Sequence, residues 1–408
     1  MNRRSVYIFG TLLVLLAPVV AEISCNSQSG KISDAVSSQP QGDPIKIGVC
    51  MPTSGPLVEL ATLQADGVRA AFQMEGAAEG RPVELIFSDP GSSGQGFGSA
   101  LEGLIGRDHV SAIIACIPAE VAVAHQGILK DRAVSFIVTS PVTFGWKSKG
   151  DEPFVRICTT LEDQAQASAR FAANTLRARR LGVILDLEDA TCVRLTSLFS
   201  ANIVRQGGSI VDVAYVKKNE DPSPALIHLM GEKTDIVYVP FSSLTSVAMI
   251  IKARAIDKEL PIIVSNVQPE EVFLSGAERS LAGVYVLTDF HEQAVISVLG
   301  KKFIEFYHKG MKKKAEIGPS IAMGADAYFL AINMILRGQH GGGQGYIPTG
   351  AQWNGSILGL SGAGPSGAVR SQLSVGFIKK GFLRDATLKF IGMVEVKGLD
   401  PGTDVRAQ

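Results

Sequence analysis

The residue types that most often carry catalysis are present in this sequence, but they are not arranged for it. The six histidines are scattered along the chain, at positions 109, 125, 228, 291, 308 and 340. No His-Glu-x-x-His motif and no pair of histidines four residues apart occurs, which argues against a zinc site. No Gly-x-Ser-x-Gly nucleophile motif occurs either. We therefore expect neither an enzyme nor a bound cofactor or metal.

The Gly-rich segment GSSGQGFG (91–98) is the one stretch that could suggest phosphate binding. It lacks the Gly-Lys-Ser/Thr ending of a phosphate-binding loop and the Gly-x-Gly-x-x-Gly spacing of a dinucleotide site. A loop that leads into a helix is the simpler interpretation.

Two polar residues beside predicted strand ends are candidates for binding a small molecule. Ser54 lies in Thr-Ser-Gly-Pro (53–56) before a predicted helix, where a serine either caps the helix or contacts a ligand. Glu120 begins the helix predicted after the third strand, where an acid either stabilises the helix dipole or contacts a ligand. Both alternatives remain open for both residues.

Short apolar runs that alternate with helical periodicity position these residues. Apolar runs bounded by turn residues are typical of buried parallel strands. The strand–helix alternation occurs in two successive series, which predicts an α/β fold with two doubly wound parallel sheets. The predicted strands are 45–49, 83–87, 112–117, 134–138, 181–185, 210–215, 236–239, 262–264 and 284–287, with strand-like 373–378 and 388–396; the predicted helices are 58–74, 97–105, 121–129, 164–176, 195–205, 225–230, 247–255, 303–307 and 321–336.

The composition excludes several classes of protein. Lys and Arg number 39 and Asp and Glu number 39, so the net charge is zero over 408 residues. A nucleic-acid-binding protein normally carries a basic excess, so we expect no nucleic-acid partner. Five cysteines are too few for a small disulfide-stabilised scaffold.

The N-terminus has the pattern of an export signal. Arg3 and Arg4 precede an uncharged run of 15 residues, Tyr7 to Ala21, which is shorter than the ~20 residues of a membrane span. We predict a signal peptide over 1–24 and a flexible, Ser- and Gly-rich tether over 25–43. Ile-Ser-Cys (23–25) resembles the end of a bacterial lipoprotein signal, although Glu22 stands where that motif has Leu. Acylation of Cys25 and a free periplasmic protein are both open.

Several segments, in a particular order and spacing, resemble those of a known family. IKIGVCMPTSGPL (45–57), RPVELIFSD (81–89), VSAIIACIPAEVAVA (110–124) and VSFIVTSPVT (134–143) are similar to its first four strands and ligand loops. FVRICTTLEDQAQA (154–167) is similar to its crossing into a second lobe, and TDIVYVPF (234–241), GVYVLTDF (283–290) and IGPSIAMGADAYFLAINMIL (317–336) match later landmarks. The family is the type I periplasmic binding proteins of the leucine/isoleucine/valine group, and the resemblance covers most of residues 44–340.

The resemblance implies two lobes joined by a hinge that close over a small solute. It implies lobe one over 44–160 plus about 286–360, and lobe two over 161–285 plus about 361–408. The expected partners are a small-molecule ligand and an inner-membrane transporter (permease) or receptor, and we expect a monomer.

The amino-acid-binding members of this family hold a zwitterion with polar groups that this sequence partly lacks. Thr143 matches their ligand threonine, but Ala119 stands at the serine position and Asn266 near the acidic position. The tyrosine positions fall near Ala190 and Ser242. Leaving a buried ammonium without its carboxylate partner costs ~2–5 kcal/mol, so a free amino acid is not the expected ligand.

A rather apolar or neutral ligand is therefore expected. An alignment slip of one or two residues, which would hide the polar anchors, is the alternative. The predicted lining is Leu60, Ala119, Pro141, Val142, Ala190 and Phe241, with neutral hydrogen bonds from Thr143, Ser242 and Asn266.

Two cysteines lie at predicted strand ends that would be neighbours in this fold. Cys50 and Cys116 follow the first and third strands. They are either a disulfide in an oxidising compartment or buried thiols, since cysteine is among the most buried residue types.

Three functions remain open from the sequence. The first is an exported solute-binding protein that delivers its ligand to a membrane transporter. A ligand-sensing receptor subunit and a periplasmic carrier of a lipid-like or sterol-like ligand are the alternatives. A hydrolase on this scaffold lacks any nucleophile–base pair that the sequence identifies.

Overall fold

The computed structural model describes most of the chain from residue 40 onward, within one compact unit, Pro40–Gln408. The predicted signal peptide, Cys25 and most of the tether lie outside the described residues. The described residues are 40–91, 94–129, 132, 134–140, 154–157, 159–217, 221–241, 243–265, 284–295, 297–314, 316–340, 360–364, 367–370, 372–378 and 388–395.

The first sheet is built almost entirely from parallel strands. Its order is β2-β3-β1-β4-β5-β6, and only the short β2–β3 pair is antiparallel. Apart from β2, the strand that comes first in the chain, β1, has the second strand, β3, on one side. The third, fourth and fifth strands, β4, β5 and β6, follow on its other side, as in doubly wound folds. The strands are β1 (Ile45–Cys50), β2 (Ala77–Ala78), β3 (Arg81–Ser88), β4 (Ala112–Ala115), β5 (Ser135–Val138) and β6 (Val155–Arg156).

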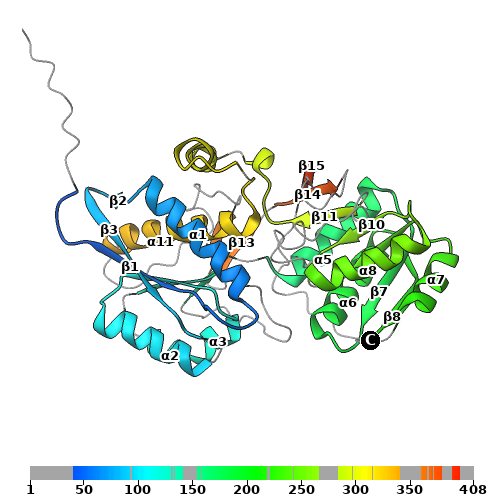
Figure 1. Cartoon of the computed structure of the whole chain (residues 1–408), viewed down its shortest axis with the longest axis horizontal. Coiled ribbons are helices and arrows are strands. Elements are labelled where there is room, and N and C mark those ends of the chain that lie inside the picture. Colours follow the sequence, from blue (N-terminus) through cyan, green and yellow to red (C-terminus); the bar gives the residue numbers. More distant parts are fainter. Residues whose placement is uncertain are drawn as a thin grey trace, which may run out of the picture. The chain divides into compact units, whose positions relative to one another are not determined.

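Helices cover both faces of this sheet (Figure 1). Side chains alternate along each strand, so Ile45, Ile47 and Val49 enter one core cluster, while Cys50 enters the other. The helices that complete the first cluster are α1 (Val58–Met74), α10 (Val298–Glu305), η5 (Phe306–Gly310) and α11 (Pro319–His340). The helices that complete the second cluster are α2 (Gly94–Glu102), η1 (Gly103–Arg107), α3 (Ala119–Ala124) and α4 (Gln126–Leu129).

The helices α1 and α11 approach each other through glycine. A Cβ at Gly67 would lie 2.0 Å from the Ile321 carbonyl oxygen, and one at Gly324 would lie 1.9 Å from the Gln64 carbonyl oxygen. No real Cβ tolerates such distances, so only glycine permits this crossing. α11 is long and apolar enough to cross a membrane, but 83% of that apolar window is buried here, as in a core helix.

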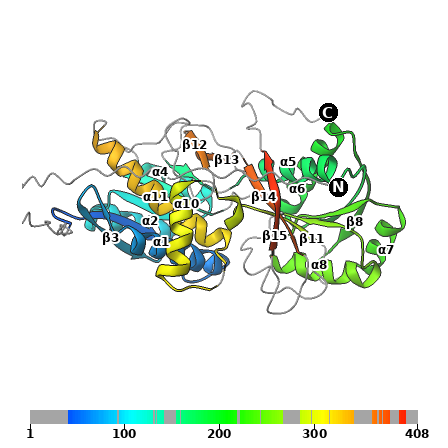
Figure 2. The ribbon, with the colours of Figure 1, turned by 90° about the horizontal axis from the view of Figure 1, so that it is seen from above.

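The second sheet repeats the strand order of the first. Its order is β15-β14-β11-β10-β9-β7-β8 (Figure 2). Strands β7 to β11 are parallel, β14 is antiparallel to β11, and β15 is antiparallel to β14. The strands are β7 (Arg180–Asp186), β8 (Ser209–Val216), β9 (Ile236–Val239), β10 (Ile262–Val264), β11 (Val284–Thr288), β14 (Gln372–Ile378) and β15 (Leu388–Glu395). A separate hairpin pairs β12 (Leu360–Gly364) with β13 (Gly367–Arg370).

Two helix pairs cover the second sheet. α5 (Leu161–Arg170), its π-helical end η2 (Phe171–Thr175) and α6 (Ala190–Arg205) pack on one face. α7 (Ser223–Gly231) and α8 (Ser243–Ile256) pack on the other. The α/β class with two doubly wound parallel sheets, predicted from the sequence, is confirmed.

Two chain crossings between the sheets lie against each other. Ile157 packs in the core of the first sheet and Leu161 in the core of the second. The chain returns between Leu287 and Phe290, which pack in the second and first cores respectively. The Thr159 hydroxyl donates a hydrogen bond to the Asp289 carboxylate, so the two crossings are tied together.

Some boundaries differ from those predicted. The helix predicted over 121–129 is two short helices, because the chain leaves helical geometry at His125 (φ −108°, ψ 9°). The helix predicted to start at residue 195 starts at Ala190, because the Asp189 carboxylate caps it and accepts from the Thr191 and Cys192 amides. Strand β6 and the β12–β13 hairpin were not predicted, since they are short or Gly-rich.

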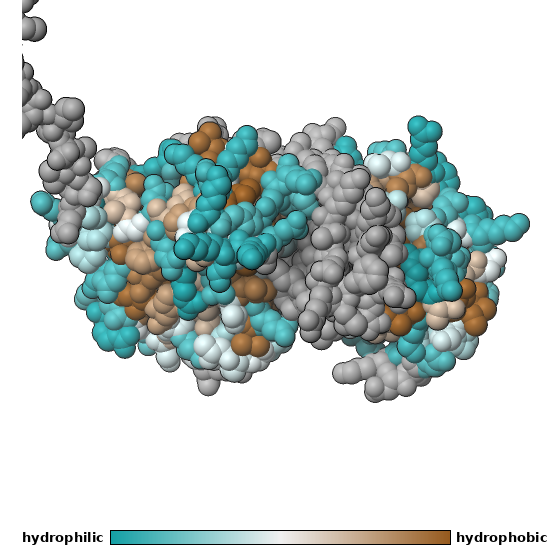
Figure 3. Space-filling model, turned by 45° about the horizontal axis from the view of Figure 1, so that its top comes forward, coloured by the Kyte–Doolittle hydropathy of each residue, from teal (hydrophilic) through white to brown (hydrophobic). Residues whose placement is uncertain are grey.

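Exposed hydrophobic side chains are spread over different elements. Phe87, Val204, Tyr215 and Ile227 lie on β3, α6, β8 and α7 and are between 43% and 65% exposed. On the face shown in Figure 3, hydrophobic residues are interspersed among hydrophilic ones. Scattered apolar residues of this kind are ordinary on protein surfaces.

Candidate ligand-binding site

The strand order of each sheet marks where a ligand would bind. In open α/β sheets, ligands bind beyond the C-terminal ends of the strands, where the strand order reverses direction. That point lies between β1 and β4 in the first sheet and between β7 and β9 in the second. The segments that leave these four strands are therefore the candidate site.

The segment after β1 is fixed by the segment after β3. The Thr53 amide donates to Asp89 Oδ1 at 3.2 Å, and the Thr53 hydroxyl donates to Asp89 Oδ2. The Gly91 amide also donates to Asp89 Oδ1, at 2.7 Å. The hydrogen bonds from the Thr53 hydroxyl and the Gly91 amide hold the pKa of Asp89 below its usual value. Asp89, which orders this loop, was not among the predicted site residues, although an Asp-Pro-Gly sequence (89–91) after a strand is a usual turn signal.

Ser54 does not cap the first helix. Helix α1 begins at Val58, with Leu57 as its N-cap and no side-chain hydrogen bond there. Ser54 lies three residues further upstream and is exposed. The capping role is therefore wrong, because the chain turns at Gly55 (φ +83°) before the helix starts. Ligand contact by Ser54 stays a prediction.

The segment after β4 carries a carboxylate with no hydrogen-bond partner for one of its oxygens. Glu120 lies in the first turn of α3, after Ala119 and the N-cap Pro118. Its Oε2 is buried and forms no hydrogen bond with the described residues. A buried carboxylate oxygen without a donor is costly, so this atom is suited to a hydrogen-bond donor from outside the described part of the chain, such as a ligand. The dipole role of Glu120 stays possible alongside this.

Two residues predicted to line the cleft, Leu60 and Phe241, are part of the hydrophobic cores. Leu60 on α1 is 4% exposed within the first core cluster, and Phe241 after β9 is 1% exposed within the core of the second sheet. Ser246 donates to the Phe241 carbonyl oxygen at 3.0 Å and so fixes this turn. Both side chains contribute to packing here, and their contact with a ligand stays a prediction.

Ala190 lies at the candidate site of the second sheet. It is exposed and forms the first residue of α6, directly after β7 and the cap Asp189. It offers no polar side chain at this position. The remaining predicted site residues, Pro141, Val142, Thr143, Ser242 and Asn266, lie outside the described residues, as does the side chain of Ala119.

The residue before Asn266 is held rigidly. The Ser265 hydroxyl lies 2.6 Å from the Tyr238 hydroxyl, and both side chains are fully buried. Burial raises the pKa of the Tyr238 phenol far above its usual range, so it stays protonated. The end of β10 therefore gives a fixed starting point to the segment that contains Asn266.

Cys50 and Cys116 do not form the disulfide that was one of the two predicted alternatives. Both are buried thiols. The strands are neighbours, and the Cys116 amide donates to the Cys50 carbonyl oxygen at 3.1 Å. Cys50 is, however, in register with Ala115, so the side chain of Cys116 points to the opposite face of the sheet. The two sulfurs lie in different core clusters, and burial raises the pKa of Cys50 to about 12.

The described part of the chain contains no group of three or more His, Cys, Asp or Glu side chains that could hold a metal ion. The polar groups at the candidate site are instead hydroxyls, main-chain amides and single carboxylates, which suit an organic solute.

Comparison with known proteins assigns the chain to a family. Residues 44–343 match the sequence model of a family described as periplasmic binding protein. The chain belongs to the periplasmic binding proteins. The family predicted from the sequence is thus confirmed, and with it solute binding as the general role of this fold. The comparison with curated proteins gives no match.

Solved structures of periplasmic binding proteins share the fold. A leucine-binding protein from Thermotoga maritima is 22% identical, with a TM-score of 0.67 over 86% of this chain and 99% of its own. A branched-chain amino acid ABC transporter periplasmic ligand-binding protein from Burkholderia xenovorans is 16% identical, with a TM-score of 0.71 over 86% and 96%. A solute-binding protein from R. palustris in complex with 4-hydroxybenzoate is 17% identical, with a TM-score of 0.64 over 87% and 98%.

These periplasmic binding proteins have ligands of different chemistry on one fold. Besides the complex with 4-hydroxybenzoate, the similar structures include a protein from Streptococcus pneumoniae in complex with isoleucine and another protein from R. palustris in complex with benzoate. Fold alone therefore does not select the ligand, and the side chains after the strands must do so.

Proposed function

We propose that this chain is an exported, monomeric solute-binding protein that captures a small neutral ligand between its two lobes and delivers it to an inner-membrane transporter. The family assignment over residues 44–343 and the matching strand order of the two sheets support this. The signal-like N-terminus supports export. Ligand bound to both lobes would favour the closed state by its higher affinity for that state.

The proposal of a neutral ligand rests on the Glu120 carboxylate. Its Oε2 is buried and receives no hydrogen bond from the described residues. Asp89, which follows β3 on the other side of β1, is also a carboxylate. A ligand carboxylate near Glu120 would meet like charge, which costs several kcal/mol. A neutral ligand with a hydrogen-bond donor would instead satisfy Oε2. Ala190, exposed and apolar at the other sheet, adds no charge that would hold an anion.

Native mass spectrometry of protein purified from its own periplasm tests solute binding directly. We expect a co-purifying small molecule that is lost on denaturation, and a rise in melting temperature when it is added back. The solute-binding role is contradicted if no mass is retained and no compound in a broad library of small solutes raises the melting temperature.

A pair of matched probes, benzamide and benzoate, tests the ligand class. They share the ring, but benzamide is neutral and carries N–H donors, whereas benzoate is an anion. We expect calorimetry to show at least ~tenfold preference for benzamide, equivalent to ~1.4 kcal/mol, and a smaller preference in Glu120→Gln. Glu102→Gln, which removes an exposed charge on α2, should leave the preference unchanged. Failure to prefer benzamide, or micromolar binding of leucine, would contradict the proposed class.

A further inference from the structure

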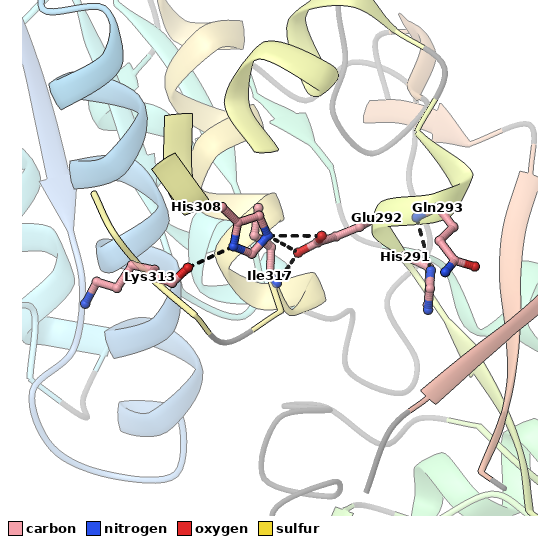
Figure 4. Close-up of polar contacts among 6 residues, drawn as sticks. All are labelled: His291, Glu292, Gln293, His308, Lys313 and Ile317. Carbon is pink, nitrogen blue, oxygen red and sulfur yellow. Dashed lines mark hydrogen bonds and ion pairs between the residues drawn. The ribbon is translucent and has the colours of Figure 1, made fainter. Parts of the chain in front are cut away.

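The second crossing is the return of the chain to the first sheet between Leu287 and Phe290. His308 lies close to it and has both ring nitrogens directed at acceptors (Figure 4). In His308, which belongs to η5, Nδ1 lies 2.9 Å from the Lys313 carbonyl oxygen. Its Nε2 lies 2.9 and 3.1 Å from the two carboxylate oxygens of Glu292. A neutral imidazole has one N–H and donates to only one of these groups, whereas imidazolium donates to both. The contacts of His308 are therefore complete only when the ring is protonated.

The same carboxylate holds a third segment of the chain. The Ile317 amide donates to Glu292 Oε1 at 2.7 Å, and the Ile317 side chain is 4% exposed in the core of lobe one. Glu292 begins the 3-10 turn η4 (Glu292–Ala294). The His308–Glu292 pair thus joins η4, η5 and the segment that precedes α11.

The surroundings of His308 favour its charged form. The Lys313 carbonyl oxygen raises the pKa of His308 most, Glu292 and the nearby charge of Glu316 raise it further, and partial burial opposes them. The Tyr307 ring meets the imidazole edge-on at 5.7 Å and brings no charge. Lys309, the neighbouring cation, is paired with Glu305 at 2.9 Å rather than with Glu292.

This pair lies directly beside the lobe crossing. Phe290, two residues before Glu292, is already anchored in the core of lobe one, and Asp289 is bonded to Thr159 of the other crossing. On the far side, Lys312 adopts a left-handed conformation (φ +57°), which is unfavourable for a residue with a Cβ. The bond from His308 to the Lys313 carbonyl oxygen stabilises this turn.

We propose that protonated His308 is a pin that fixes the lobe-one end of the second crossing, and that its deprotonation as the pH rises loosens this segment. The sign follows from linkage: a histidine whose pKa is raised in the folded state contributes stability fully below ~6.5, and loses it as the pH rises through the raised value. The pin does not depend on the proposed function. A protein exported to the periplasm would meet the pH changes of the outside medium.

Hydrogen exchange followed by mass spectrometry tests the pin without any ligand. The readout is the protection factor of peptides that contain residues 292–295 and 316–318. This factor is the exchange rate of the unfolded chain divided by the observed exchange rate at the same pH. We expect wild-type protection to fall about tenfold between about pH 6 and about pH 8.5. In His308→Gln, protection should be low and independent of pH.

A second histidine–carboxylate pair provides the matched control. His228 on α7 lies 3.0 Å from Asp212 and is exposed at the other sheet. His228→Gln should therefore leave the pH dependence of both peptides intact. The NMR titration midpoint of His308 should lie above ~6.5 and should drop in Glu292→Gln.

Two results would overturn the pin: a His308 midpoint at or below ~6.5, or an unchanged pH dependence in His308→Gln. Because no ligand is used, such a result leaves the solute-binding role untouched. Conversely, a protein that binds no solute would still show the pin.

Discussion

The two sheets have the same strand order, but the helix pairs on their equivalent faces are packed in different ways. In lobe one, α1 and α11 meet through Gly67 and Gly324, each against a main-chain carbonyl oxygen of the other helix. This layer buries Gln64 on α1 and Ser320 and Asp326 on α11. Asn333 Oδ1 on α11 is buried without a hydrogen bond to a described residue, whereas Gln64 is fully paired with Thr139. Gln64 Nε2 donates to the Thr139 carbonyl oxygen at 2.9 Å, and the Thr139 hydroxyl donates to Gln64 Oε1 at 2.5 Å.

In lobe two, α5 and α6 form the corresponding layer, and its buried polar side chains are less well paired than Gln64. Gln164 and Ser168 lie four residues apart on α5, and Thr196 lies on α6. All three are buried, and within the described residues Gln164 Oε1, Ser168 Oγ and Thr196 Oγ1 form no hydrogen bond of normal geometry. The Ser168 hydroxyl interacts with the Tyr238 phenol and the Thr196 hydroxyl with the Cys192 thiol. Beside them, Tyr238 stacks on Phe199 with ring centroids 3.8 Å apart.

The difference shows that topology does not determine how a helix layer tolerates change. In a close helix crossing with paired polar groups, almost any substitution lowers the free energy of unfolding. A layer whose buried polar groups lack hydrogen bonds of normal geometry already carries part of the ~1–3 kcal/mol cost of an unpaired group, so some substitutions there should cost little. The following changes test this contrast.

The largest effect is expected from Gly324→Ala. The new Cβ would lie 1.9 Å from the Gln64 carbonyl oxygen, so α1 and α11 must move apart. We expect the free energy of unfolding, from urea denaturation, to fall by ~3 kcal/mol or more. Gly106→Ala in η1 is the matched control, because nothing lies within 4 Å of its Cβ position. Equal stabilities of the two variants would contradict the close crossing, and Gly67→Ala should repeat the loss.

A smaller loss is expected from Thr139→Val in lobe one. The change keeps the shape but removes the hydroxyl that donates to Gln64 Oε1, leaving a fully buried amide oxygen without its donor. We expect the free energy of unfolding to fall by ~1–3 kcal/mol. The loss should vanish in the Gln64→Leu background, where no partner remains to be left unpaired. The same loss in both backgrounds would mean that the pair carries no coupling.

The strands and the first helix were predictable because their signals are local. The helix Val58–Met74 and the strands Ile236–Val239 and Ile262–Val264 have the predicted bounds, since apolar spacing and flanking turn residues define them. The start of α6 was missed by five residues, although Asp189 ahead of Ala190 is the usual N-cap signal.

The candidate site was predictable in position but not in contacts. Its loops follow strand ends, which the sequence locates. Whether Leu60 faces a ligand or the core depends on α11, more than 250 residues later in the chain, and no local pattern shows this. The facing directions of Cys50 and Cys116 depended on a one-residue difference in register, since Cys50 pairs with Ala115.

The smallest effect is expected from Thr196→Val in lobe two, the same chemical change as Thr139→Val. The Thr196 hydroxyl is buried and forms no hydrogen bond of normal geometry with a described residue. It interacts with the Cys192 thiol, which is a weak hydrogen-bonding group. Threonine and valine are both β-branched, so helix propensity and shape are nearly conserved. Removing a weakly paired polar group relieves its desolvation cost, and we expect the free energy of unfolding to stay within ~0.5 kcal/mol or to rise. Urea denaturation of both variants beside the wild type gives the comparison. A loss at Thr196 as large as that at Thr139 would mean that the Cys192 thiol satisfies the hydroxyl fully, and that the two hydroxyls are equally well paired.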